Sequence, residues 1–361
     1  MASTVIANIV EPHIFLQYVQ YISTQLSTFW TSGIVQNNEQ FNAIARQGGR
    51  TFTMPAWDDL ATTEPNRSHD SGTAVPLNIA AFSEVAAKQY RNQVWGAMDL
   101  VASVAGSDPM MAIARRVGTY WARVMQDTLI SVLKGVLADN EANDSGDMLN
   151  DIYSDVAPAS ITSANLIGPE AIIDTAATMG DMSENVVAMA MHSVPYHRLQ
   201  KLDLIEYRSY VDTVQSPDAI VQDANAFGFK ISQQTLQIPF YLGKRVIVLD
   251  SMPTAAGSSG GSPSYLTVLF APGAIAHGEG TPRVPIEIER DAKAGTGGGE
   301  EILAMRREFI LHPRGISWQD SSISSDGTGP KNSDLELEAN WDRPTAIDRN
   351  SIRIAYLRSN G

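Results

Sequence analysis

The stretch SDPMMAIARRVGTYWARVMQDTLISVLKGVLA, residues 107–138, decides the fold. Asp108 is a residue type that caps helix N-termini, and Pro109 suits the first helical position. After them, apolar residues recur at steps of three and four along one stripe: Met110, Ile113, Val117, Tyr120, Trp121, Val124 and Leu129. This pattern predicts a helix over 108–138, roughly 30 residues and about 45 Å long, where about 11 to 12 residues is usual. Because no heptad seam with flanking charge pairs is sustained, we expect a spine helix packed on a sheet.

Composition sets the broad class of the protein. The chain has 361 residues, 43% of them hydrophobic and 18% charged, which is enough to bury a core in one large domain or two ordinary ones. Without cysteine, disulfides, thiolate metal sites and a cysteine nucleophile are excluded. No Lys or Arg precedes Arg46, and no run of about 18 apolar residues occurs. We therefore expect neither a signal peptide nor a membrane span, and synthesis in the cytoplasm.

The charge balance bears on the partners of the protein. Lys and Arg number 26 against 40 Asp and Glu, which gives a formal net charge of -14. This is the wrong sign for a protein that grips phosphates, so it argues against sequence-specific DNA binding. An acidic container remains compatible with DNA, because a wall that repels phosphate lets packed DNA slide.

The N-terminal segment, residues 1–38, is unusually poor in charge. Besides its tyrosines, its only ionisable side chains are Glu11 and His13. Apolar residues recur there at three- and four-residue steps, as on one face of a helix. Two interpretations stay open: a core helix of the same subunit, or an arm that docks on neighbouring subunits. The large aromatic side chains that either reading must bury are Phe15, Tyr18, Tyr21, Phe29 and Trp30.

A long two-stranded hairpin is predicted next. In GGRTFTMPAWDDL, residues 48–60, Phe52 and Met54 alternate with threonines as in a half-exposed strand, and Pro55 ends the strand or marks an edge. A polar stretch over 61–74 leads to apolar residues at alternate positions over 75–79, and then to the helix-like FSEVAAKQYRNQVW, residues 82–95. Because an isolated hairpin is marginal in water, we expect it to lie on another surface.

The second half of the chain follows an acidic loop that we expect over 138–151. Helices are predicted over 169–179 and 194–207, and buried strands within 185–193 and 243–253. Strands alternating with helices indicate a layered α/β lobe. Flexible loops are expected over 255–263 and 295–299, and further strand-bearing segments over 265–278, 285–291, 302–318 and 350–360.

Three motifs could carry chemistry, and each has a simpler explanation. Gly257, Ser259 and Gly261 satisfy G-x-S-x-G, but a nucleophile elbow needs a strand before it and a helix after it, and this context is a low-complexity loop. The six histidines show no metal-ligand spacing. The carboxylates of the 138–151 loop lack the EF-hand pattern, so we interpret it as a solvated acidic loop. No catalytic, cofactor or metal site is predicted.

A stripe of carboxylates, Glu287, Glu289 and Asp291, lies along one predicted strand. Alternate positions would place the three groups on one face, but no paired His, Lys or glycine-rich phosphate loop accompanies them. We interpret this acidic stripe as exposed or facing another subunit, where it meets basic residues from elsewhere.

The order of segments, from apolar arm through hairpin and spine helix to α/β lobe and returning strands, resembles the Hong Kong 97 type of tailed-phage capsid protein. The resemblance rests on the order and spacing of short stretches along nearly the whole chain. These are TSGIVQNN, GGRTFTMPAWDDL, VWGAMDLVASVAGSDPMMAIARRVGTYWARV, MAMHSVPYHRLQKLDLIEY, IPFYLGKRVIVLDSMP, FAPGAIAHGEGTP, FILHPRGISW and LELEANWDRP.

The resemblance implies an α+β fold in five segments. These are an N-terminal arm over 1–40, an extended loop over 41–95, a peripheral domain over 96–160 with spine helix 108–138, an axial α/β domain over 161–300 with loops at 254–263 and 292–299, and strands over 301–361 that return to the peripheral domain. Candidate inter-subunit contacts are Phe15, Tyr18, Tyr21, Phe29, Trp30, Trp57, Asp58, Asp59 and Arg67.

By the same likeness, the protein is expected to be a major capsid protein that assembles into an icosahedral head shell around phage DNA. Its copies would form pentamers and hexamers through heterologous contacts that close into rings. Implied partners are a portal, a separate scaffolding protein, expected because the chain starts directly at its arm, and in some relatives decoration proteins. The expected location is the virion, after assembly in the host cytoplasm, with no enzymatic activity and no cofactor.

Three other functions compete with a phage shell. An encapsulin-like nanocompartment shares the fold but encloses enzyme cargo, and finding DNA inside purified shells would exclude it. If the protein were a hydrolase that uses Ser259, the substitution Ser259→Ala would abolish its activity. A monomeric tail or adhesin protein would be excluded by mass in sedimentation.

Overall fold

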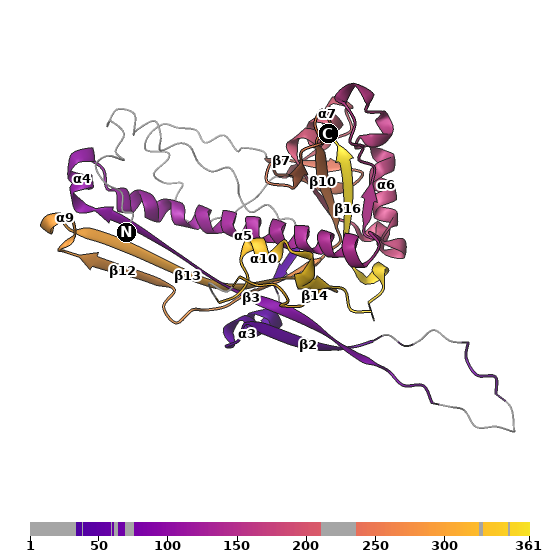
Figure 1. Cartoon of the computed structure of the whole chain (residues 1–361), viewed down its shortest axis with the longest axis horizontal. Helices are drawn as coiled ribbons and strands as arrows, with labels where there is room; N and C mark the ends of the chain where they lie inside the picture. Colours follow the sequence, from indigo (N-terminus) through magenta and orange to yellow (C-terminus); the bar gives the residue numbers. More distant parts are fainter. Residues whose placement is uncertain are drawn as a thin grey trace.

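The computed structural model describes residues 34–37, 39–58, 60, 64–68, 76–210, 236–324, 328–345 and 347–361. The apolar segment predicted as an arm or core helix falls almost wholly outside these residues. The described chain mixes helices and strands, as predicted (Figure 1). Among the described residues, no helix is both long and apolar enough to cross a membrane.

The spine helix α5 spans Pro109–Asn143. Its N-cap is Asp108, whose side chain accepts a hydrogen bond from the Met110 amide at 2.9 Å, and Pro109 occupies the first turn. The predicted end at residue 138 is wrong, because the first residues of the expected acidic loop continue the helix. The reason lies far along the chain: Arg358 pairs with Glu141 at 2.8 Å, and Arg343 pairs with Asp144 at 3.1 Å. These arginines neutralise carboxylates that would otherwise repel one another.

A six-stranded sheet is formed within the described residues, in the order β1-β11-β13-β3-β2, with β12 added beside β13. All of its pairs are antiparallel except β1 with β11. Its strands are β1 Val35–Asn37, β2 Thr51–Trp57, β3 Ala81–Met98, β11 Ile275–Glu279, β12 Ile286–Asp291 and β13 Glu300–Pro313.

The helix-like reading of residues 82–95 is wrong, because these residues belong to the 18-residue strand β3. Pairing on both sides overrides the local pattern: Thr51 of β2 lies opposite Ala87, and Leu303 of β13 lies opposite Trp95. Ala86 packs on one face, under helix α3 (Glu39–Arg46), and Ala87 packs into the main core on the other. Burial on both faces removes the alternation that would have marked a strand.

The second sheet has eight strands in the order β4-β16-β10-β5-β8-β7-β6, with β9 beside β10. In β10, Val268 and Phe270 face the core that contains α5, whereas Leu269 faces a second core formed with α6 and α7. Its strands are β4 Leu149–Asp151, β5 Ala188–Met191, β6 Glu206–Tyr210, β7 Leu236–Tyr241, β8 Lys244–Val248, β9 Thr254–Ala255, β10 Ser264–Phe270 and β16 Ile354–Asn360.

The remaining elements are short. Helix α6 confirms the helix predicted over 169–179, whereas the helix predicted over 194–207 ends early and gives way to β6. Strands β14 (Ser317–Trp318) and β15 (Trp341–Asp342) form a small separate pair. The helices are α4 Asp99–Ala105, α6 Pro169–Ala177, α7 Ser193–Lys201, α9 Ala294–Gly297 and α10 Asn332–Leu335, with 3-10 turns η2 Pro158–Ser160, η3 Ser163–Asn165, η4 Gly180–Asn185, η5 Glu338–Asn340 and η6 Arg349–Ser351.

Helix α5 joins the two sheets. Its N-terminal half places Val117 and Trp121 against Leu303 of β13, and its C-terminal half places Leu129 and Leu133 in the core with β10. The predicted division at residue 300 is therefore wrong: β11 and β12 precede it but lie in the six-stranded sheet, whereas β16 follows it but lies in the eight-stranded sheet. In Figure 1 the eight-stranded lobe stands at the C-terminal end of α5, and the β2–β3 hairpin projects away below it.

Candidate functional site: the projecting hairpin and the α5 groove

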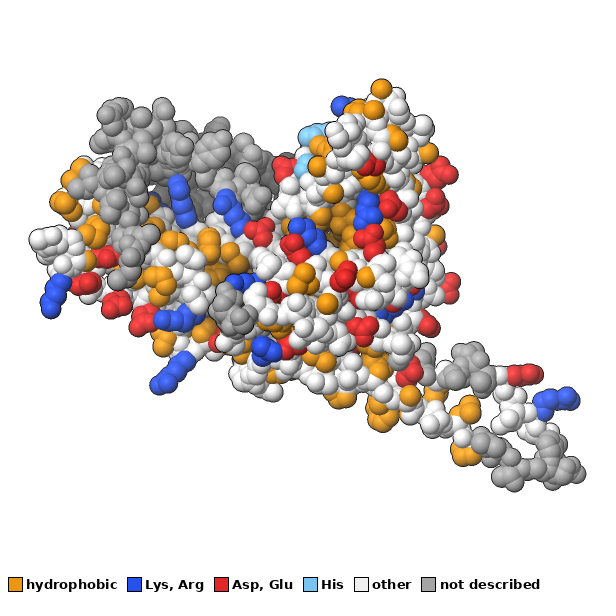
Figure 2. All heavy atoms as spheres, viewed as in Figure 1, with side chains coloured by type: hydrophobic (Ala, Val, Ile, Leu, Met, Phe, Trp, Pro, Cys, Tyr) orange, Lys and Arg blue, Asp and Glu red, His pale blue; other side chains and the backbone are white. Residues whose placement is uncertain are grey.

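The hairpin extends beyond its own sheet. The β2–β3 ladder ends at Trp57 opposite Ala81, and one further bond runs from the Asp58 amide to the Ala80 carbonyl at 2.9 Å. The strand expected over 75–79 is not formed by residues 76–80, which lie outside any strand or helix. Figure 2 shows hydrophobic side chains along the hairpin where it leaves the body. Four large ones are exposed: Trp57 by 71%, Leu60 by 67%, Leu77 by 71% and Ile79 by 44%.

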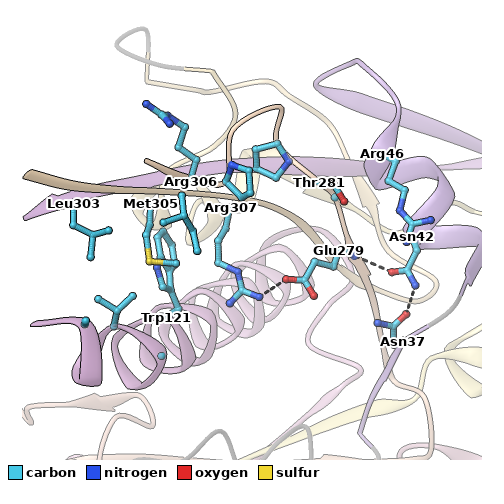
Figure 3. Close-up of a pocket in the computed structure, with 17 residues that line it drawn as sticks. Asn37, Asn42, Arg46, Trp121, Glu279, Thr281, Leu303, Met305, Arg306 and Arg307 are labelled. Carbon is cyan, nitrogen blue, oxygen red and sulfur yellow. Dashed lines mark hydrogen bonds and ion pairs between the residues drawn. The ribbon is translucent and has the colours of Figure 1, made fainter. Parts of the chain in front are cut away.

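A hollow of about 710 Å³, which we call the α5 groove, lies between the N-terminal half of α5 and the β12–β13 pair. Its floor is Leu303 and Met305 of β13, and Ile286 of β12 forms part of one wall. Figure 3 shows Trp121 rising from α5 toward these β13 side chains. The α5 residues that line the groove are Ala114, Val117, Gly118 and Trp121.

Trp121 is the groove residue with a buried polar atom that lacks a hydrogen-bond partner among the described residues. Its side chain is only 3% exposed, yet its Nε1 has no hydrogen-bond partner among the described residues. The ring packs edge-on against Tyr120 at 5.5 Å between centroids, and the Arg307 guanidinium lies 6.0 Å from its centroid. A buried N–H without a partner costs free energy.

Polar residues close one end of the groove (Figure 3). Arg307 forms an ion pair with Glu279, whose amide donates to Asn42 Oδ1 at 2.9 Å. Asn42 Nδ2 in turn donates to Asn37 Oδ1 at 2.7 Å. Nearby on β11, burial lowers the pKa of His277, which favours its neutral form. This network of hydrogen bonds holds the polar end of the α5 groove in place. The apolar lining residues lie toward β12.

The structure describes only some of the candidate inter-subunit contact residues. Trp57 and Arg67 are exposed and Asp58 is half-buried, all on the hairpin segment. Asp59 and the five aromatic residues of the N-terminal segment lie outside the described residues. Sequence reasoning missed the groove. One signal was present: Ala114 and Gly118, four residues apart on the exposed side of the stripe, leave a notch in an otherwise bulky helix face.

The G-x-S-x-G motif does not form a nucleophile elbow. Ser259 is exposed in a turn between the two-residue strand β9 and strand β10. The Asp155 carboxylate holds this loop by accepting from the Ser258 amide at 3.1 Å, and it packs against Gly261. The Asp155 carboxylate therefore anchors this loop through Ser258 and Gly261, not through Ser259.

The other charged motifs are used in pairing. Glu287 of the acidic stripe pairs with Arg306 at 2.8 Å, as expected of a stripe that meets basic residues. His312 is buried with its Nε2 3.1 Å from Glu84, and His192 caps α7. Within the described ranges, no group of three His, Asp or Glu side chains could hold a metal ion.

Asp139, at the C-terminal end of α5, is the most perturbed carboxyl group of the acidic stretch. It is 1% exposed, and burial raises its pKa to about 6, against the opposing effect of a 2.7 Å hydrogen bond from Asn143. Asp144 and Asp342 raise the pKa further, and Arg343 lowers it. In the unfolded chain the pKa is about 3.9, so the folded state binds more protons between these values. Stability contributed here is therefore present below about pH 4 and is lost as the pH rises to about 6.

We predict that Asp139→Asn stabilises the subunit at pH 7 by about 1 to 3 kcal/mol and flattens its stability between about pH 4 and 6. The amide keeps an acceptor for Asn143 without a buried charge. Denaturant melts of both proteins at several pH values measure this, with the exposed Glu338→Gln as control. A steeper or unchanged slope in Asp139→Asn would contradict the assignment.

Solved structures with a similar arrangement include capsids of bacteriophages. The capsid of Ralstonia phage GP4 matches with a TM-score of 0.56 at 10% identity, over 100% of this chain and 94% of that one. The capsid asymmetric unit of cyanophage Pam1 matches with a TM-score of 0.55 at 10% identity, over 94% of both chains. The fold is therefore that of phage capsid subunits.

Sequence comparison identifies one family among the phage capsid proteins. The model of the major capsid protein 13-like family matches residues 105–351. The major capsid protein of Bacillus phage SPP1 is 34% identical over 360 residues, which cover 99% of this chain and 98% of the relative. The chain belongs to the major capsid protein 13-like family, which confirms the predicted resemblance to phage capsid proteins.

Proposed function

We propose that this protein is the subunit that builds the shell of a phage head around genomic DNA. The observation that carries this function is the full-length match, at 34% identity, to a phage major capsid protein. A shell subunit acts through contacts between copies, and this chain has an exposed apolar hairpin and an open apolar groove. Its place is the virion, in a multi-subunit capsid. The relatives do not favour the nanocompartment alternative, and a shell subunit needs no catalytic residues.

The finer architecture that we propose is of the Hong Kong 97 type. The β2–β3 hairpin would be the extended loop, and α5 with the six-stranded sheet would be the peripheral domain. The eight-stranded lobe would be the axial domain at the centre of pentamers and hexamers. Because the hairpin and the groove are different surfaces, their contact would be heterologous and would close into rings, as an icosahedral shell requires.

The proposed inter-subunit contacts fall in two groups. The first is the hairpin group Trp57, Asp58, Asp59 and Arg67, supported by the exposure of Trp57. The second is the N-terminal group Phe15, Tyr18, Tyr21, Phe29 and Trp30, supported by a segment with few charges. The exposed Trp57 is an apolar surface that a single subunit leaves in water.

Other partners follow from assembly in the host cytoplasm around DNA. We propose a portal, a separate scaffolding protein and, as an open alternative, decoration proteins. The enclosed DNA would be held without sequence recognition, because the net charge of -14 gives the chain little means of gripping phosphates.

The test is assembly itself. We expect the purified protein, with its scaffold present, to form rings or closed shells in electron micrographs and in sedimentation, with DNA in shells from infected cells. A single species near 39.1 kDa under all conditions would contradict a shell function. Shells that hold enzyme cargo in place of DNA would instead favour a nanocompartment.

A further inference from the structure

We propose that the solvent-exposed face of α5 binds the phosphate backbone of the enclosed DNA through Arg115, Arg116 and Arg123. We call these three residues the arginine face. The inference rests on the proposed shell function and adds a DNA-contact site to it. It is carried by the placement of the three arginines, by the lack of carboxylates around them and by the chemistry of the guanidinium group.

The arginine face lies on the side of α5 that points away from the six-stranded sheet. Val117 and Trp121 of the same stretch pack against Leu303 of β13. At about 3.6 residues per turn, the three arginines fall roughly opposite those two α5 side chains. All three arginines are exposed, and Figure 2 shows Lys and Arg side chains along α5 on the side away from β12 and β13. The arginines are therefore turned toward solvent, where a ligand outside the subunit can reach them.

The described part of the chain leaves the positive charge of this face largely uncompensated. Residues 109–126 of α5 contain three arginines and no Asp or Glu, although the whole chain has a formal net charge of -14. None of the three arginines forms an ion pair with a described residue. Asp127 follows Arg123 by one turn and offsets part of its charge, whereas Arg115 lies about 10 Å along the helix from Asp108. That separation is about one Debye length at physiological salt, so the surface around Arg115 stays positive.

The chemistry of the side chains favours a phosphate ligand. A guanidinium group stays charged and donates two parallel hydrogen bonds to one phosphate. Arg116 and Arg123 are seven residues apart, about 10 Å along the helix. This distance corresponds to about three base-pair steps of duplex DNA at about 3.4 Å each. The arginines can therefore reach separate phosphates of one duplex.

The residues between the arginines favour DNA over a protein partner. They include Ala112, Thr119 and Ala122, whose small side chains let a duplex approach the helix closely. A protein interface needs a central patch of large apolar side chains, which these residues do not supply, whereas a phosphate backbone needs only donors and positive charge. Two or three phosphates per subunit make a weak contact, and the shell repeats this contact in every copy. The enclosed DNA is thereby held at the wall without sequence recognition.

The first test measures DNA binding by full-length subunits, with a fluorescent duplex of about 20 base pairs and increasing salt. The test variant replaces the three residues of the arginine face by glutamine. A control variant removes three positive charges at exposed residues that form no ion pair with a described residue: Lys201→Gln, Arg283→Gln and Lys293→Gln. The two variants have the same net charge, so a difference between them reports the position of the lost charges.

For the unmodified protein, we expect the logarithm of the binding constant to fall against the logarithm of the salt concentration with a slope of about -2 to -3. The test variant should bind at least about tenfold more weakly at low salt. Its slope should be shallower by about 2 or more, because each lost phosphate contact removes about 0.9 from the slope. The control variant should keep the slope of the unmodified protein. Melting curves check that both variants still fold, as expected for exposed positions.

A second test, cross-linking in DNA-filled shells, changes none of the arginines. Because the chain has no cysteine, Thr119→Cys places a single thiol among the arginines. Val94→Cys places one on the opposite face of the six-stranded sheet, at a residue that is 51% exposed. Val94 faces away from α5, because its neighbour Trp95 packs in the cluster that contains Trp121. With a short thiol-directed photocross-linker, we expect DNA adducts at Thr119→Cys at least about tenfold above those at Val94→Cys.

Three outcomes overturn the inference while leaving the shell function standing. One is equal weakening of DNA binding by the test and control variants, which would assign binding to net charge. A second is DNA adducts at Val94→Cys and none at Thr119→Cys, which would turn the opposite face of the sheet toward the DNA. The third is normal DNA binding by the test variant with loss of scaffolding-protein binding, which would assign the arginine face to an acidic protein segment. Failure of the unmodified chain to form any shell would instead defeat the proposed function.

Discussion

Gly135→Ala is expected to leave the chain molten or insoluble. Gly135 lies in the C-terminal half of α5, where the Trp341 indole donates a 2.8 Å hydrogen bond to the Leu335 carbonyl. A Cβ on Gly135 would overlap both the carbonyl oxygen and the indole nitrogen. Neither can retreat easily, because Trp341 is 3% exposed and packs edge-on against Trp318 at 5.0 Å. We expect a loss of about 3 kcal/mol or more, well above the gain of about 1 kcal/mol that alanine brings to a helix.

Gly118→Ala provides the matched control in the same helix. Its Cβ would meet no atom within 4 Å, so only the helix preference of alanine remains. We expect it to stabilise the subunit by about 0.5 to 1 kcal/mol. Denaturant melts of both variants, with yield of soluble protein, measure the difference. Equal effects from the two substitutions would show that the close packing around Gly135 is misjudged.

The spine helix could be predicted because its information is local. The cap at Asp108 directly precedes the helix, the proline and the apolar stripe lie within it, and each is observed. Its C-terminal end could not be predicted, since the arginines that neutralise its carboxylates, Arg343 and Arg358, come from about 200 residues further along the chain. A local pattern contains no information about such partners.

Strand β3 shows the opposite case. Residues 82–95 have helix-like spacing, and the strand exists because β2 and β13 pair with it on both edges. The α5 groove could not be predicted from the sequence for the same reason. Its floor and one wall come from β13 and β12, more than 150 residues beyond the α5 residues that form the other wall. The burial of Trp121 was predictable from its stripe. That its Nε1 lacks a hydrogen-bond partner among the described residues was not, because hydrogen bonding depends on what packs nearby.

Deleting residues 1–28 is expected to abolish stable shells while leaving a subunit that folds and melts cooperatively. The described cores are formed by residues from Ile34 onward, and Ile34 itself is fully buried. Residues 1–30 contain a single carboxylate, no Lys or Arg and five large aromatic side chains. Burying each ring contributes roughly 1.5 to 3 kcal/mol, but ordering the chain costs about 1 to 2 kcal/mol per residue.

For a single subunit these opposing contributions leave little net gain, so we expect the segment to be held firmly only where neighbouring copies add a second surface. Docking would then be cooperative across the shell. The alternative, a helix of the subunit's own core, predicts insoluble or molten protein after the same deletion. Melting curves of the truncated subunit, recorded beside electron micrographs of its assembly, decide between the two. Normal shells from the truncated protein would defeat both, because they would mean that the three large aromatic side chains it lacks, Phe15, Tyr18 and Tyr21, are not needed either for folding or for assembly.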